Sequence, residues 1–79
     1  MNRYKIMVIE DDPVIQAELQ TLLDGNGYAS AAVRDFSAVI EAVREESPHL
    51  ILLDIRLPGE SGFTLCSKIR TFSNAPIIF

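Results

Sequence analysis

Four short apolar runs alternate with longer stretches of helical periodicity along this chain. The runs cover residues 5–9, 28–32, 50–54 and 77–79. The first and third are apolar without alternation, which is typical of parallel strands that are covered on both faces. The second run is rich in Ala, a weak strand former, so we expect it nearer an edge of the sheet.

Three helices are expected between these runs. The first begins where Asp12 caps Pro13, because Asp is a favoured N-cap and Pro fits the first helical position. It ends at the Gly-Asn-Gly of 25–27, which supplies left-handed residues. The second helix is expected over about 37–46 and the third over about 61–71.

The side chains that should face the core follow from the helical repeat. Each helix has one apolar stripe, and the remaining positions are mostly polar. The stripes are Ile15, Leu19 and Leu22 or Leu23 in the first helix, Val39, Ile40 and Val43 in the second, and Phe63, Cys66 and Ile69, with Leu65 beside them, in the third.

This alternation predicts an α/β fold, a flavodoxin-like doubly wound parallel sheet with helices on both faces. The element order is strand, helix, strand, helix, strand, helix, strand. Because the apolar strand 77–79 has no helix after it and would leave an open edge, we expect residues 1–79 to be an incomplete domain that lacks at least one further βα unit. We also expect either self-association through that strand or partial disorder.

Composition narrows the function classes. The chain has 79 residues, 48% of them apolar, enough for one packed domain and too few for two. A net charge of −4 argues against direct binding to nucleic acid or anionic lipid. With Cys66 as its single cysteine and no secretory or membrane-spanning segment, the protein is expected in the cytoplasm.

Carboxylates follow two of the expected central strands. Glu10, Asp11 and Asp12 come directly after the first strand, and Asp54 ends the third. Ligands of open parallel sheets bind at the carboxyl ends of the strands. Two like charges ~4 Å apart repel by roughly 4 kcal/mol at an effective dielectric of 20, so a cation should offset the crowding. Mg²⁺ fits, because it binds one or two carboxylates and keeps other positions open.

Asp54 is the candidate phosphoryl acceptor. Carboxylates, Mg²⁺ and open coordination positions together suggest phosphoryl transfer onto an Asp side chain. The segment 57–60 (Leu-Pro-Gly-Glu) has the composition of a type II turn, with Pro second and Gly third. Such a turn would hold Asp54 in a fixed orientation for in-line attack.

Three segments together resemble the receiver domain of two-component response regulators. They are Val-Ile-Glu-Asp-Asp-Pro at 8–13, Leu-Leu-Asp-Ile-Arg-Leu-Pro-Gly-Glu-Ser-Gly at 52–62 and Ala-Pro-Ile-Ile at 75–78. The resemblance runs the whole length of the chain. It implies the strand order 2-1-3-4-5 of that family and identifies 1–79 as the N-terminal part of such a domain.

The resemblance also implies roles for individual residues. Asp54 would accept a phosphoryl group from a sensor histidine kinase. Asp11 would be a direct Mg²⁺ ligand together with Asp54, Glu10 would hold the ion through water, and Arg56 would contribute its backbone carbonyl. Asp12 would remain the helix cap.

The implied function is a signalling module rather than an enzyme. Phosphorylation would regulate an output partner or a C-terminal DNA-binding domain outside this chain, and so transcription. The sequence departs from the family at its end, because the Ser or Thr after the fourth strand and the Lys after the fifth are absent. A truncated or degenerate receiver that binds partners independently of phosphorylation is therefore the alternative.

Other candidate sites have simpler explanations. An aspartate-nucleophile phosphatase would need Asp-x-Asp, and Arg56 occupies the place of the second Asp. His49 has no second His or Cys near it in the sequence, and Cys66 lies on the expected inward stripe, where a free thiol behaves as a small apolar group. We interpret both residues as structural.

Overall fold

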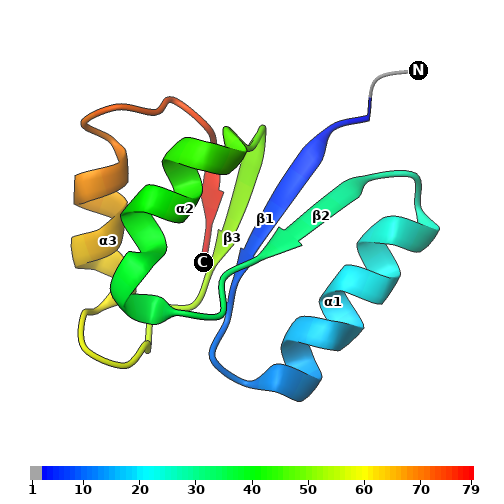
Figure 1. The fold of residues 1–79 in the computed structure, drawn as a ribbon, viewed down its shortest axis with the longest axis horizontal. Helices are drawn as coiled ribbons and strands as arrows, with labels where there is room; N and C mark the ends of the chain where they lie inside the picture. The colour runs from blue at the N-terminus through cyan, green and yellow to red at the C-terminus, as the bar shows by residue number, and fades with distance from the viewer. Residues whose placement is uncertain (1–2) are drawn as a thin grey trace.

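Four parallel strands form a single sheet in the computed structural model, which describes residues 3–79. The strands are β1 (Lys5–Ile9), β2 (Ala29–Ala32), β3 (Leu50–Leu53) and β4 (Ile77–Ile78), and their order is β2-β1-β3-β4 (Figure 1). The first and third apolar runs, β1 and β3, are therefore the central strands, and the Ala-rich second run, β2, lies at an edge. These three predictions and the predicted α/β fold class are confirmed.

Three helices connect the strands. They are α1 (Pro13–Gly25), α2 (Val39–Glu46) and α3 (Gly62–Ile69). The second helix differs from its predicted start at 37, because Asp35 caps a short 3₁₀ turn over Phe36–Ala38 that precedes α2. The third ends at Ile69, two residues earlier than predicted.

The helix ends have the capping residues that the sequence indicated. The Asp12 carboxylate accepts hydrogen bonds from the amides of Val14 and Ile15, with Pro13 as the first helical residue of α1. Gly27 follows α1 with a φ of +87°, a conformation that favours glycine. Ser61 caps α3 by accepting from the Thr64 amide at 3.2 Å.

The two faces of the sheet are covered unequally. On one face α2 and α3 pack over the inward side chains of β1 and β3, and the nine core residues there are 5% exposed or less: Met7, Ile9, Val33, Val39, Val43, Ile51, Leu53, Leu65 and Ile69. On the other face α1 contacts β1 and β2, and none of its residues is fully buried. Figure 1 shows α1 separated from the α2 and α3 pair by the sheet.

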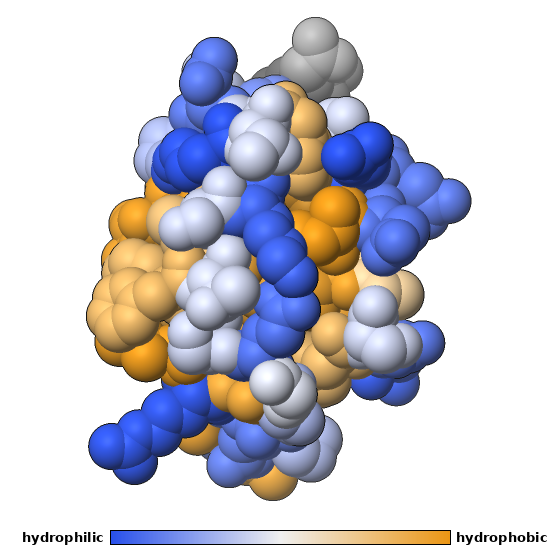
Figure 2. All heavy atoms as spheres, turned by 90° about the vertical axis from the view of Figure 1, so that its left-hand side faces the viewer, coloured by the Kyte–Doolittle hydropathy of each residue, from blue (hydrophilic) through white to orange (hydrophobic). Residues whose placement is uncertain are grey.

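Two predicted core positions, Phe63 and Ile15, are wrong. Phe63 is 58% exposed, because Leu65 and Ile69 take the inward face of α3 and Phe63 lies against the ring of Phe79. In α1, Ile15 is also exposed, and of the two alternatives Leu22 is exposed while Leu23 is partly buried. Figure 2 shows hydrophobic residues exposed on both sides of a hydrophilic strip on the α3 side of the molecule.

Candidate functional site

The pairing of β1 with β3 brings the acidic residues together. Ile9 is the register partner of Leu53, so the next residues along each strand, Glu10 and Asp54, become neighbours. The Asp54 amide donates to the Ile9 carbonyl at 2.9 Å and extends this pairing beyond the strand. Two carboxylates more than forty positions apart in the sequence are thus fixed by backbone hydrogen bonds.

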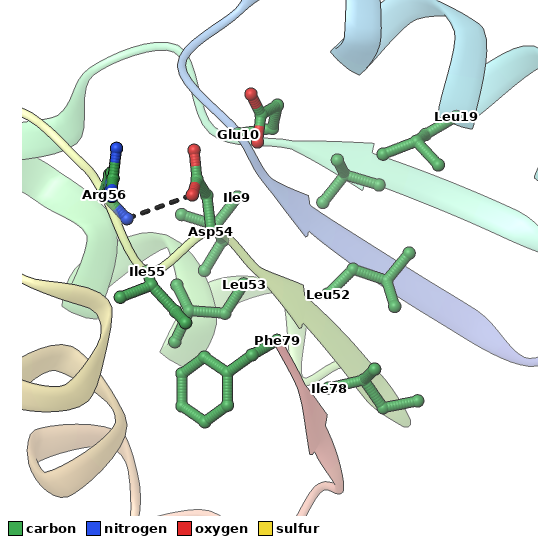
Figure 3. Close-up of a pocket in the computed structure, with 11 residues that line it drawn as sticks. Ile9, Glu10, Leu19, Leu52, Leu53, Asp54, Ile55, Arg56, Ile78 and Phe79 are labelled. Carbon is green, nitrogen blue, oxygen red and sulfur yellow. Dashed lines mark hydrogen bonds between the residues drawn. The ribbon is translucent and has the colours of Figure 1, made fainter.

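Three carboxylates converge at this edge of the sheet. Glu10, Asp11 and Asp54 each offer a carboxylate oxygen, and these oxygens all lie within 4.8 Å of one another. Figure 3 shows the carboxylates of Glu10 and Asp54 at the adjacent ends of their strands. The fourth acid, Asp12, is used as the cap of α1. The sequence-based expectation that these strand ends meet agrees with the geometry.

The backbone holds the Asp54 side chain in place. Its Oδ1 accepts a hydrogen bond from the Arg56 amide at 3.0 Å (Figure 3). The loop that follows closes through a bridge between Arg56 and Ser61. Gly59 has a φ of +88°, as the third position of a type II turn requires. The carboxylate therefore projects from a defined turn.

Gly62 allows α3 to begin close to this turn. Its amide donates to the Ile55 carbonyl at 2.7 Å. A Cβ at this position would lie 2.5 Å from the Asp54 carbonyl oxygen and 2.8 Å from the Ile55 Cα, both of them backbone atoms. Only glycine permits the approach, a requirement that the sequence did not reveal by itself.

The electrostatic surroundings raise the pKa of the Glu10 carboxyl above its ordinary value of 4.5. Burial is the largest cause, and the charges of Asp54 and Asp11 act in the same direction. A hydrogen bond that Glu10 accepts from the Asp12 amide, at 3.3 Å, opposes them. The Glu10 carboxyl is therefore less easily ionised than a solvated one.

No cationic side chain of residues 3–79 forms an ion pair with these acids. The two ion pairs in this part of the chain join Lys5 to Glu46 and Lys68 to Glu60. An oxygen-only donor set with excess negative charge suits a hard divalent cation such as Mg²⁺. The residues therefore fit the expected ion.

An apolar pocket of about 580 Å³ lies beside the acids on the less covered face of the sheet. Val8 of β1 lines it. Leu52 of β3, Leu19 of α1 and Ile78 of β4 also line it (Figure 3). Glu10 and Asp54 line the same pocket. The acids consequently lie at the boundary between a polar edge and an open apolar surface.

Sequence reasoning missed one residue at this site, Gln16 of α1. Its side-chain amide donates to the carbonyls of Glu10 and Val33. The Val33 contact joins residues 17 positions apart, so no local pattern could have indicated it. His49, interpreted as structural, accepts a hydrogen bond from the Lys5 amide through Nδ1 at 2.9 Å.

The helices described over residues 3–79 include none with the length and apolar character needed to cross a lipid bilayer.

Comparison with known proteins gives a consistent result. Residues 6–79 match the response regulator receiver domain. The transcriptional regulatory protein YxdJ of Bacillus subtilis is 43% identical over 75 residues, which are 95% of this chain and 33% of that protein. The chain thus spans about a third of this curated relative.

Solved structures agree. The N-terminal domain of the nisin resistance regulator NsrR superposes with a TM-score of 0.91 at 36% sequence identity. The match covers 99% of this chain and 66% of the NsrR chain. The response regulator TrrA, solved in complex with the histidine kinase ThkA, gives a TM-score of 0.83 at 28% identity, over 94% of this chain and 65% of that one. The chain belongs to the response regulator receiver domain family of two-component signalling systems.

Proposed function

We propose that this chain is the phosphoacceptor part of a two-component response regulator and that Asp54 carries the phosphoryl group. The convergence of the Glu10, Asp11 and Asp54 oxygens within 4.8 Å is the observation that supports this most strongly. Asp54 directly follows the central strand β3, and its Oδ1 accepts a hydrogen bond from the Arg56 amide at 3.0 Å. A fixed carboxylate is a suitable nucleophile for in-line transfer.

In the proposed step, an Asp54 carboxylate oxygen forms a bond to the phosphorus of a phosphodonor. The bond between phosphorus and the donor's leaving atom breaks, and the leaving group keeps that electron pair. The product is an acyl phosphate on Asp54. The step needs no general base, because a carboxylate nucleophile has no proton to lose on attack.

Asp11 and Asp54 would hold Mg²⁺ directly, Glu10 would hold it through water, and the backbone carbonyl of Arg56 would complete the protein ligands. When bound, Mg²⁺ screens the charge of the incoming phosphoryl group. The protein's own contribution is the placement of Glu10 and Asp54 side by side, which the β1–β3 hydrogen bonds supply.

We further propose that residues 1–79 are the N-terminal part of the receiver domain of a longer protein. Relatives such as YxdJ are about three times as long, and the apolar pocket beside β4 is a surface that a further helix would cover. The phosphodonor would be a sensor histidine kinase, by analogy with the ThkA–TrrA complex. The output would be transcriptional, through a DNA-binding domain, and the protein would act in the cytoplasm.

The test is incubation of the 79-residue chain and of its longer parent with acetyl phosphate and Mg²⁺, followed by mass spectrometry. We expect one hydroxylamine-labile phosphoryl group on Asp54, lost in Asp54→Ala and strongly reduced without Mg²⁺. Glu18→Gln, which changes an exposed acid of α1, is the matched control and should leave labelling unchanged. An unlabelled parent protein would refute the proposal.

A second candidate function is protein interaction without phosphorylation. It is favoured by the open apolar surface, where Ile78 is 52% and Phe79 53% exposed. The same surface supports self-association through β4, which a concentration series in analytical ultracentrifugation would measure. Partner binding or dimerisation that is unaffected by Asp54→Ala would favour this candidate over the first.

A further inference from the structure

Gln16 makes an unusual pair of contacts from the first turns of α1. Its Nε2 lies 3.3 Å from the Glu10 carbonyl oxygen and 3.1 Å from the Val33 carbonyl oxygen. A primary amide nitrogen has two hydrogens, so one side chain can donate to both oxygens. The two acceptors belong to different loops.

These loops follow the first two strands of the sheet. Glu10 begins the acidic loop after β1, and Val33 comes directly after β2, where its amide bonds to the Val8 carbonyl at 3.4 Å. The backbone amide of Gln16 donates to the Asp12 carbonyl at 2.9 Å. The acidic loop is therefore held at both ends by a single residue, through the side chain at Glu10 and through the main chain at Asp12.

We infer that Gln16 is a positioning residue for the cation site, an inference that rests on the function proposed above. The acids repel one another, and the loop that carries two of them must resist this repulsion in order to keep their oxygens near Asp54. The Gln16 amide opposes displacement of the Glu10 backbone. Without it, the loop would relax away from Asp54 and bind the cation less tightly.

The chain provides a matched control in Gln20. Gln16 and Gln20 are its only glutamines, and Gln20 lies about one turn further along α1. Its Nε2 contacts the Ser30 hydroxyl of β2 at 3.5 Å, so it also connects α1 to the second strand. Within residues 3–79, its side chain forms no hydrogen bond with the acidic loop. Loss of either amide should affect the packing of α1, but only one should affect the site.

The experiment is isothermal titration of Mg²⁺ into the 79-residue chain and into Gln16→Met and Gln20→Met, which keep side-chain length and remove the donors. We expect the Kd of Gln16→Met to rise about tenfold, the lower end of the effect of residues that support metal ligands. The Kd of Gln20→Met should stay within about twofold of the unmodified chain, even if both variants melt at lower temperature.

Equal Mg²⁺ affinities for the two variants would overturn the inference while leaving the proposed function intact. Absence of saturable binding to the unmodified chain would instead overturn the proposed cation site, and the inference with it. The two failures are thus distinguishable.

Nuclear magnetic resonance of the unmodified chain gives a test that does not depend on variants folding. The two glutamine side-chain amides give separate signals, and Mg²⁺ should shift the signal of Gln16 and leave that of Gln20 in place. A Gln16 signal that stays unchanged while the backbone amides of Asp11 and Asp54 shift would contradict the inference.

Discussion

The two ends of the sheet both carry charged side chains, but only at one end is a carboxylate paired with a cationic side chain. At the carboxyl end, Glu10, Asp11 and Asp54 bring three like charges together. At the amino end, the Lys5 ammonium lies 3.2 Å from a carboxylate oxygen of Glu46 and donates to the Glu46 carbonyl as well. The Glu46 carboxylate at the amino end therefore has a cationic partner within residues 3–79, and the three acids at the carboxyl end do not.

His49 completes the amino end. Its Nδ1 accepts from the Lys5 amide, its own amide donates to the Lys5 carbonyl, and its ring meets that of Tyr4 edge to face at 5.2 Å. These partners explain the placement of His49 without any ligand. The comparison teaches that polar residues alone do not indicate a site; the informative feature is charge whose partner must come from outside the chain.

The largest expected effect on stability comes from a change that disturbs the backbone at the carboxyl end of the sheet. Gly62→Ala should lower the free energy of unfolding by about 3 kcal/mol, because its Cβ would overlap the Asp54 carbonyl and force the turn to move. Urea unfolding followed by circular dichroism measures this loss.

Gly25→Ala is the control for Gly62→Ala. Gly25 lies in α1, and a Cβ added there would have no heavy atom within 4 Å beyond its own helix turn and chain neighbours. Alanine at this position should therefore be neutral or stabilising by up to about 1 kcal/mol. If the two variants were equally stable, Gly62 would not be required for the close approach of α3 to Asp54.

Asp12 and Asp11 are neighbours in sequence, but replacing them should change the free energy of unfolding in opposite directions. Asp12→Ala should lower the free energy of unfolding by about 1 kcal/mol, because it removes the cap that accepts from the Val14 amide. The loss should be the same with and without Mg²⁺. A loss that appears only with Mg²⁺ would mean that Asp12 belongs to the cation site instead.

Asp11→Asn should raise the free energy of unfolding by about 1 kcal/mol when divalent cations are absent, because it relieves repulsion in a partly exposed cluster. At the other end of the sheet, Glu46→Gln should lower it by about 0.5 kcal/mol, because it breaks a half-exposed ion pair. Thermal denaturation in EDTA measures both. Effects of the same sign would remove the distinction between the two ends.

The smallest expected effect is the pH dependence that Glu10 causes. Its raised pKa means that folding favours the protonated carboxyl, so its contribution to stability is fully present below pH 4.5 and is lost as the pH rises through the higher folded-state pKa. Glu10→Gln should therefore become more stable than the unmodified chain, in EDTA, as the pH rises above 4.5. If the stability of the two proteins changed with pH in parallel, the raised pKa of Glu10 would be contradicted.

Much of this arrangement was predictable from the sequence, because it depends on local chemistry. Non-alternating apolar runs identified the central strands, and Asp12-Pro13 identified the start of α1. The position of acids directly after two such strands was enough to predict that they meet, since neighbouring parallel strands end at the same edge. Their individual roles toward Mg²⁺ stay predictions.

The errors arose where the outcome depends on distant parts of the chain. Periodicity placed Phe63 inward, but its surroundings depend on Phe79, whose ring centroid lies 5.0 Å away. Ile15 is exposed because α1 covers only part of its face of the sheet. The contacts of Gln16 likewise require the end of β2 to lie beside the loop after β1.

The most direct test of the central claim is a calorimetric Mg²⁺ titration of the unmodified chain, Asp11→Asn, Asp54→Ala and the exposed control Glu18→Gln. If acids from β1 and β3 share one cation, the unmodified chain and Glu18→Gln should bind a single Mg²⁺ with equal affinity. Both site variants should then bind at least about tenfold more weakly. Binding by Asp54→Ala as tight as that of the unmodified chain would contradict the shared site.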